Sequence, residues 1–249
     1  MAYHPPLPPA GVLLKFARDR QRWRYWLFQA RKRFGLTVLN YSVTSNHIHL
    51  LVRDRGQGEI ARDIQLIAGR TAREYNRRKQ RHGTYWKDRY HATAVDTDGY
   101  LARCMVYFDL NMVRAGAVSH PVQWDVCGYR EIQQPPARYR VIDLAAVRDL
   151  LGIRDPGTLQ HDHATWVDET LKAAPLRRDE IWTQSLAVGS QAFVARFQSE
   201  NGMAACHRER VQDGDRHRLR EAAASYSGHF GVEMAALSAD NKVYLDEFV

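Results

Sequence analysis

YSVTSNHIHLLV, residues 41–52, has the clearest strand and turn pattern in the sequence. It predicts the end of one strand, a tight turn, and a second strand that carries His47 and His49. Alternate residues of a strand point to the same face, so the two imidazoles lie side by side while Ile48 and Leu50 face a core. Two imidazoles at this spacing form half of a metal site. A His-x-His pair alone is more often an ordinary surface or core pair, so the metal interpretation requires further ligands from elsewhere in the chain.

The composition is that of a globular protein kept in a reducing compartment. The chain has 249 residues, of which 45% are hydrophobic, and this favours one domain plus a smaller second one. No apolar run approaches the roughly twenty residues of a membrane span, and the first residues lack the pattern of a secretory signal. The three cysteines, Cys104, Cys127 and Cys206, form no CxxC pair. They argue against a disulfide framework and a thiolate zinc site, so we expect a cytoplasmic protein.

Positive charge is concentrated in the first part of the chain. Residues 1–150 carry 25 Lys and Arg against 13 Asp and Glu, whereas residues 151–249 carry 11 against 15. A basic first part beside a mildly acidic second part indicates that the first part binds a polyanion such as a nucleic acid. A solvated, arginine-rich surface without a partner explains the charge alone equally well.

Hydrophobic periodicity predicts an α+β fold, an antiparallel sheet with helices packed on it. Besides the hairpin, the pattern predicts a strand at about 89–95 and helices at about 15–34, 60–81 and 99–115. A proline-containing linker at 133–140 separates this part, residues 1–140, from a second region, residues 141–249. That region is predicted to be helical, with helices at about 143–151, 158–173 and 178–200 and a weak helix or mobile tail after residue 214.

Basic and aromatic side chains cluster on the helix after the hairpin and on the segment that follows it. Their density favours contact with phosphates, although cations near a helix C-terminus also favour the helix dipole. Aromatic rings next to cations are surfaces on which unpaired bases stack, although such rings are also common in cores. The candidate DNA-binding residues are Arg70, Arg73, Arg77, Arg78, Tyr85, Trp86, Lys87 and Arg89.

A second cluster of chemical interest lies on the helix predicted at about 99–115. Tyr107 and Asn111 are four residues apart, so they share one face of that helix. A phenol and a neutral oxygen ligand on one face could meet the histidine pair across the sheet. Without such a partner, Tyr107 would be an ordinary half-buried tyrosine and Asn111 a polar surface residue.

Three segments together resemble the REP-associated tyrosine transposases, which belong to the single-tyrosine HUH transposase superfamily. They are NHIHLLV at 46–52, YWKDRYHA at 85–92 and YFDLNMVRAG at 107–116, and the resemblance covers about residues 15–132. It implies a ferredoxin-like palm of antiparallel strands. It also implies His47, His49 and Asn111 as ligands of Mg²⁺ or Mn²⁺, and Tyr107 as the nucleophile. Met112 stands where family members usually have proline.

The implied reaction is cleavage and strand transfer on single-stranded DNA through a 5′-phosphotyrosine. The implied partner is a hairpin formed by repetitive palindromic DNA with single-stranded flanks, and the chain would act as a monomer or a homodimer. The family begins with a strand before its first helix. Here the first predicted helix follows HPPLPPAGV, so we expect that strand to be missing or poorly replaced by residues 11–14.

Two other functions are consistent with the sequence. The first is a domesticated relative that binds structured DNA or RNA without cutting it. The second is a metal-dependent hydrolase that uses water in place of tyrosine and leaves no covalent protein–DNA adduct.

Overall fold

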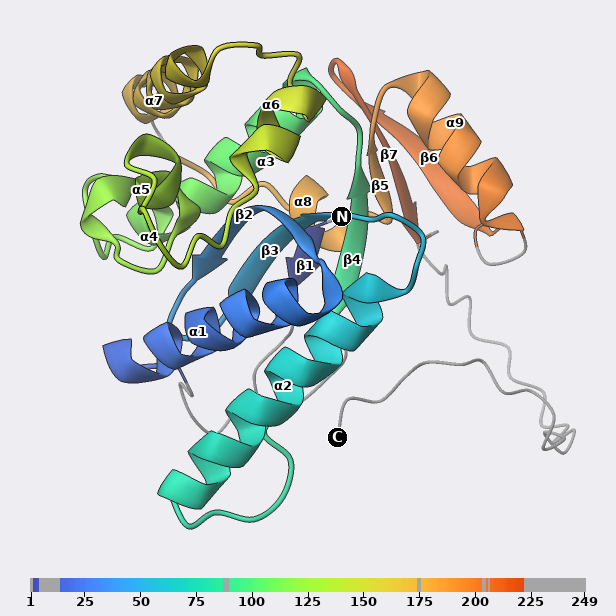
Figure 1. The fold of residues 1–249 in the computed structure, drawn as a ribbon. Helices are drawn as coiled ribbons and strands as arrows, with labels where there is room; N and C mark the ends of the chain where they lie inside the picture. The colour runs from blue at the N-terminus through green and yellow to red at the C-terminus, as the bar shows by residue number, and fades with distance from the viewer. Residues whose placement is uncertain are drawn as a thin grey trace, which may run out of the picture.

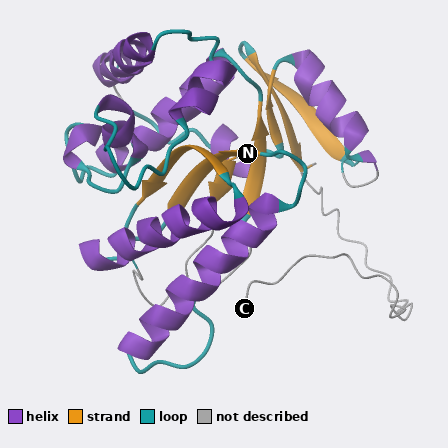
Figure 2. Ribbon diagram, viewed as in Figure 1, coloured by secondary structure: helices purple, strands orange, loops and turns teal. Residues whose placement is uncertain are grey.

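A seven-stranded mixed sheet organises the molecule (Figures 1 and 2). The computed structural model describes residues 2–4, 14–86, 90–173, 176–202, 205 and 207–221. The strands run in the order β2-β3-β1-β4-β5-β7-β6. Their bounds are β1 Ala2–His4, β2 Thr37–Val43, β3 Ile48–Arg53, β4 His91–Val95, β5 Ala187–Gly189, β6 Arg208–Asp213 and β7 Arg216–Glu221. The predicted α+β class is confirmed.

The hairpin of β2 and β3 has the predicted architecture. The two strands pair antiparallel from Val43 opposite Ile48 onward. The side chain of Thr44 closes the turn, because its Oγ1 accepts the backbone N–H groups of Asn46 and His47 at 3.3 and 2.8 Å. Ile48 and Leu50 are buried, as the alternation predicts. The hairpin therefore fixes the direction in which the histidine side chains leave the sheet.

β1 corrects the expectation that the first strand is missing. Ala2–His4 lies between β3 and β4 and pairs antiparallel with both, with Tyr3 opposite Leu50 on one side and Ala92 on the other. The strand ends directly before Pro5, whose ring nitrogen cannot donate to a ladder. Three residues are too few to show a period of two, so the sequence pattern could not reveal this strand.

Helices cover both sides of the sheet. In the view of Figure 1, α1 and α2 run side by side below the sheet, and α3, α5 and α7 lie above it. The longer helices are α1 Ala17–Phe34, α2 Glu59–Arg78, α3 Gly99–Asp109, α7 Pro156–Lys172 and α9 Gln191–Glu200. The shorter ones are α4 Asn111–Arg114, α5 Gly128–Gln133, α6 Leu144–Leu150 and α8 Ile181–Gln184, with a 3-10 turn at Pro121–Gln123. Among the described residues, every helix is too short or too polar to cross a membrane.

The region after residue 140 contains strands as well as the predicted helices. β5 pairs parallel with β4, and β7 and β6 continue the sheet beyond it. The weak helix expected after residue 214 is wrong for residues 216–221, which form β7, and the remaining residues, 222–249, lie outside the described part. The division of the chain at residue 140 stays a prediction.

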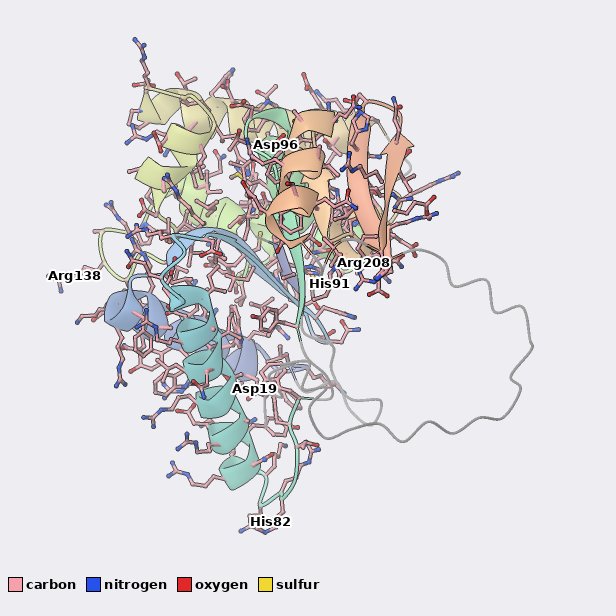
Figure 3. The ribbon with its side chains drawn as sticks, turned by 90° about the vertical axis from the view of Figure 1, so that its right-hand side faces the viewer. Asp19, His82, His91, Asp96, Arg138 and Arg208 are labelled. Atoms are coloured by element: carbon pink, nitrogen blue, oxygen red, sulfur yellow. The ribbon has the colours of Figure 1, made fainter. Side chains whose placement is uncertain are left out.

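The helix predicted at 178–200 is interrupted by β5. Ser190 ends this strand and caps α9 by accepting the backbone N–H of Phe193. Gly189 has no room for a side chain, because an added Cβ would lie 2.5 Å from the Cβ of Asp96. Asp96, where β4 ends beside α9 (Figure 3), also accepts the N–H and the hydroxyl of Ser190. The apolar residues before and after this glycine have helical spacing, so the sequence pattern predicted one continuous helix where the structure has α8, β5 and α9.

Candidate functional site

His47 and His49 lie on one face of β3 and its turn. Their ring centroids are 6.4 Å apart and the ring planes differ by only 22°. His47 is exposed, whereas the side chain of His49 is buried, with 7% of the residue accessible. The ring of His49 lies 5.3 Å from that of Phe108 on α3. The strand alternation therefore turns the imidazoles toward the helix on which Tyr107 lies.

Tyr107 is the neighbour of Phe108 and is buried near the C-terminal end of α3. Its ring lies 6.3 Å from that of Trp182 in α8. The guanidinium carbon of Arg114 sits 3.9 Å above its ring centroid, and Arg114 Nη2 donates to the Tyr107 carbonyl at 2.5 Å. The phenol is thus enclosed by a cation on one face and an indole nearby.

Asn111 begins α4, directly after Leu110 interrupts the helix predicted at 99–115. Its Oδ1 accepts a hydrogen bond from Arg114 Nη2 at 2.6 Å. Its Nδ2 is buried without a hydrogen-bond partner among the described residues. An orphaned amide N–H₂ group is costly to bury and indicates a place for an acceptor that the described part of the chain does not supply.

The electrostatics of the site link His47 to Tyr107. Partial desolvation and the positive charge of Arg178 lower the pKa of His47. Burial raises the pKa of Tyr107, and the cations Arg114 and Arg178 oppose this rise. Because Arg178 acts on both groups, the imidazole and the phenol belong to one electrostatic environment.

The donor chemistry of the two histidines and Asn111 suits a divalent cation. No cluster of three His, Cys, Asp or Glu side chains in the described ranges could hold a metal, and the predicted set differs because an amide is its third member. A lowered pKa keeps the His47 imidazole neutral at pH 7, which is the form that binds metals. The amide oxygen of Asn111 keeps one lone pair beside its bond to Arg114. These residues therefore fit the predicted ion.

Comparison with known families is informative for the first part of the chain. Residues 14–109 match the sequence profile of the family described as "Transposase IS200 like". This segment of the chain is therefore similar to the IS200-like transposases. The matched range includes both histidines and Tyr107, and ends before Asn111 and Arg114.

A solved structure similar to this chain is that of a REP-associated tyrosine transposase bound to a REP hairpin. The match has 14% sequence identity and a TM-score of 0.42, and it covers 57% of this chain and 86% of the other. None of the curated proteins matches the sequence significantly.

Two aromatic residues predicted to stack on DNA bases lie in the hydrophobic core. Tyr85 is 2% exposed and Trp86 7% exposed, and their rings contact each other edge to face at 4.7 Å. The indole N–H of Trp86 donates to the carbonyl of Ala68 in α2. Neither ring offers a free face to a base, so the stacking prediction for these two residues is wrong. Burial of these two large aromatic rings in the core was more favourable than exposing them beside the neighbouring cations.

α2, which carries the predicted phosphate-binding cations, lies on the other side of the sheet from α3, the helix that contains Tyr107 (Figure 1). Arg78 pairs with Asp19 of α1 at 2.5 Å, and Figure 3 shows Asp19 beside α2. The guanidinium of Arg70 lies 5.3 Å from the ring centroid of Trp26. Arg73 and Arg77 are exposed. Lys87 and Arg89 lie outside the described residues, so the structure does not address them.

A buried polar network beside Tyr107 was not predicted from the sequence. Asp109 Oδ2 bonds His163 Nε2 at 2.8 Å, and Oδ1 accepts from Asn40 Nδ2 at 3.2 Å and from the thiol of Cys127 at 3.4 Å. All four side chains are buried. The network joins α3 to β2 and α7, so it holds in place the helix that carries Tyr107. No local pattern signals it, because its members are up to 123 positions apart.

Proposed function

We propose that this chain cleaves and rejoins single-stranded DNA through a 5′-phosphotyrosine on Tyr107. His47, His49 and Asn111 would hold Mg²⁺ or Mn²⁺. The proposed substrate is a hairpin of repetitive palindromic DNA with single-stranded flanks. The observation that carries the proposal is the contact between His49 and Phe108, which brings the histidine face of β3 against the residue next to the phenol.

The covalent step conserves the phosphodiester. The phenolic oxygen of Tyr107 attacks phosphorus in line, an O–P bond forms, and the bond from phosphorus to the 3′ oxygen breaks. The phenolic proton passes to solvent and the departing 3′ oxygen takes up a proton, which leaves a free 3′-hydroxyl. Reversal of this step onto another 3′-hydroxyl joins strands without another energy source. A divalent ion, when bound, polarises the phosphoryl oxygens.

Arg114 is assigned two tasks in this reaction. Its guanidinium stacks on the Tyr107 ring and opposes the rise in phenol pKa that burial causes, so it favours the phenolate. The same group bonds the Asn111 oxygen and fixes the orientation of that amide. Arg178 adds a second cation near the phenol and His47, where the charge of a scissile phosphate would need compensation.

The exposed arginines of α2 remain our candidates for phosphate contacts. Arg73 and Arg77 are exposed and free to reach a backbone, whereas Arg78 would first have to leave Asp19. Because α2 and α3, the helix that contains Tyr107, lie on different sides of the sheet, one DNA molecule contacting both must wrap around an edge of the sheet. A hairpin with a single-stranded flank has the shape and flexibility for this path.

The test is a denaturing gel with 3′-labelled single-stranded DNA that contains the hairpin, in the presence of Mn²⁺. The native chain should yield a covalent adduct and a Tyr107→Phe variant none, whereas Tyr139→Phe, at an exposed tyrosine, should react normally. A Tyr107→Phe variant that still formed the adduct would remove Tyr107 from its role.

Metal dependence has its own matched pair of variants. His47→Ala should abolish cleavage and spare most of the binding, because phosphate contacts carry most of the affinity. His82→Ala, at an exposed histidine at the far end of α2 (Figure 3), should retain cleavage. Normal cleavage by His47→Ala, or the same activity in EDTA, would contradict the metal assignment.

One observation favours a non-cleaving DNA or RNA binder as the second candidate. Arg114 already donates a hydrogen bond to Asn111 Oδ1, and this oxygen is the atom that would have to bind the metal ion in the cleavage mechanism. The same gel distinguishes the two functions, because a binder shifts the mobility of the hairpin on a native gel and leaves no adduct on a denaturing one.

A further inference from the structure

A cavity of about 580 Å³ opens beside Tyr107, between α3 and the region that follows residue 165. α3 contributes Tyr107 and Ala102, Leu110 follows directly after α3, and α7 contributes Trp166. The segment at 176–182 and Arg216 of β7 complete the wall. Most of this wall comes from residues beyond the part that matches the transposase family, so the cavity is a feature that the C-terminal region adds.

The size and chemistry of the cavity fit a nucleobase with its sugar. Ligand pockets of 300–1,000 Å³ with mainly apolar walls and a few polar groups are typical of small-molecule sites. Here the walls are aliphatic and aromatic, and Trp166 is half-buried at the cavity. Thr170 and Glu169 provide hydrogen-bonding groups on the same wall. A flat heteroaromatic ring gains most from such walls, because it stacks on an indole and hydrogen-bonds at its edge.

The charges around the cavity indicate an anionic ligand. Arg103 and Arg216 line it and are paired with Asp215 and Asp179 at 2.7 and 2.6 Å. Arg177 also lines it, is exposed, and forms no ion pair within the described residues. An arginine at the rim of an otherwise apolar cavity is suited to the phosphate attached to a bound nucleoside.

We propose that this cavity binds an unpaired nucleotide of the DNA strand immediately beside the phosphodiester attacked by Tyr107. Because Tyr107 forms part of the wall, an occupant of the cavity lies next to the phenol. A base held there would fix the position of the adjoining phosphate relative to the nucleophile. The proposal rests on the proposed function for the identity of the strand, and it assigns to the C-terminal region the task of substrate selection.

The experiment measures binding of a hairpin oligonucleotide in EDTA, which prevents metal-dependent cleavage. A series of oligonucleotides carries one abasic site at each successive position of the single-stranded flank, and fluorescence anisotropy gives the Kd of each. Stacking of one base is worth about 1–3 kcal/mol, so the native chain should bind one member of the series roughly 5- to 150-fold more weakly than the intact strand.

A cavity-filling variant shows whether that base occupies the cavity. Ala102→Phe introduces a ring from α3 into the space, and it should bind the intact and the abasic strand equally, at the weaker affinity. Ala192→Phe, at an exposed position of α9, is the matched control and should keep the native pattern. Ala173→Trp, on the opposite wall, replaces the first variant if thermal melting shows that Ala102→Phe is unfolded.

The outcomes separate this proposal from the proposed function. If no abasic position weakens binding, or if both filled variants keep the native sensitivity, the cavity does not bind the base. A free deoxynucleotide that binds the native chain and not Ala102→Phe, without any abasic effect in the strand, would make the cavity a mononucleotide site and would equally overturn the proposal. Each of these results leaves the Tyr107 adduct assay unchanged, whereas loss of the adduct alone refutes only the cleavage reaction.

Discussion

Replacement of Asp109 by alanine is the sharpest test of how α3 is held in place. The carboxylate is the acceptor for three buried donors, from His163, Asn40 and Cys127. His163 Nδ1 lies 3.1 Å from the amide nitrogen Nε2 of Gln133, which is a donor, so His163 Nδ1 accepts this hydrogen bond. The other ring nitrogen, His163 Nε2, therefore carries the hydrogen and donates to Asp109. Removal of the carboxylate therefore leaves His163, Asn40 and Cys127 without the acceptor that Asp109 provides.

The size of the effect follows from the number of orphaned groups. An unsatisfied buried donor costs about 1–3 kcal/mol, and three buried donors lose their bond to the carboxylate together. We expect Asp109→Ala to lower the free energy of unfolding by about 3–5 kcal/mol. Asp109→Asn keeps an oxygen for Asn40 and places an amide N–H₂ against His163, so its cost should be smaller, about 1–3 kcal/mol.

The assay is urea unfolding of a double-mutant cycle with Asp109→Ala and His163→Ala. Because the side chains touch, the two losses should not add, and the coupling energy should reach about 1.5 kcal/mol or more. His161→Ala, at an exposed histidine of the same helix, should change stability by less than about 0.5 kcal/mol. Losses below about 1 kcal/mol, or strictly additive losses, would refute the network as the anchor of α3.

Three further predictions concern single groups. Burial raises the pKa of Asp63 to about 7, so the folded state holds its proton between pH 4 and 7 while the unfolded state loses it. Stability therefore falls as pH rises through this window, by at most about 4 kcal/mol, and Asp63→Asn should flatten this slope in urea titrations. Arg114→Met removes a cation that lowers the pKa of Tyr107, so the pH profile of adduct formation should move to higher pH; an unmoved profile contradicts this role. In a plot of the logarithm of the DNA-binding constant against the logarithm of the salt concentration, Arg77→Ala should make the slope shallower by about 0.7–0.9. Arg154→Ala, at another exposed arginine, should leave the slope unchanged.

The central part of the fold was predictable from local patterns. β2 begins and ends at the predicted residues, 37–43, because a short run rich in β-forming residues favours a strand without long-range information, and all seven of its residues are buried. β1 and β5 have three residues each and carry too few positions for a period to show. β6 and β7 were missed because their charged residues resemble a loop. They pair with each other through backbone hydrogen bonds, and the pattern of their side chains does not indicate this pairing.

The sequence predicted which site residues close together in the chain share a face, and it did not predict the contacts that distant segments make with them. Strand alternation was enough to place His47 and His49 on one face. The four-residue spacing was enough to place Tyr107 and Asn111 close together, and Arg114, which the sequence analysis did not single out, contacts both. The burial of Tyr85 and the influence of Arg178 depend on contacts between segments far apart in the chain. Sequence patterns report which residues share a face, and only tertiary packing decides what covers that face.

Mass spectrometry of the covalent adduct tests directly whether Tyr107 is the residue that attacks the DNA. After reaction with hairpin DNA and Mn²⁺, nuclease treatment leaves a short nucleotide stub on the modified tyrosine. Trypsin then releases residues 104–114, in which Tyr107 is the one tyrosine. We expect the nucleotide mass on this peptide and a free 3′-hydroxyl on the released strand. Cleaved DNA with that peptide unmodified, or a stub on any other tyrosine, would contradict it.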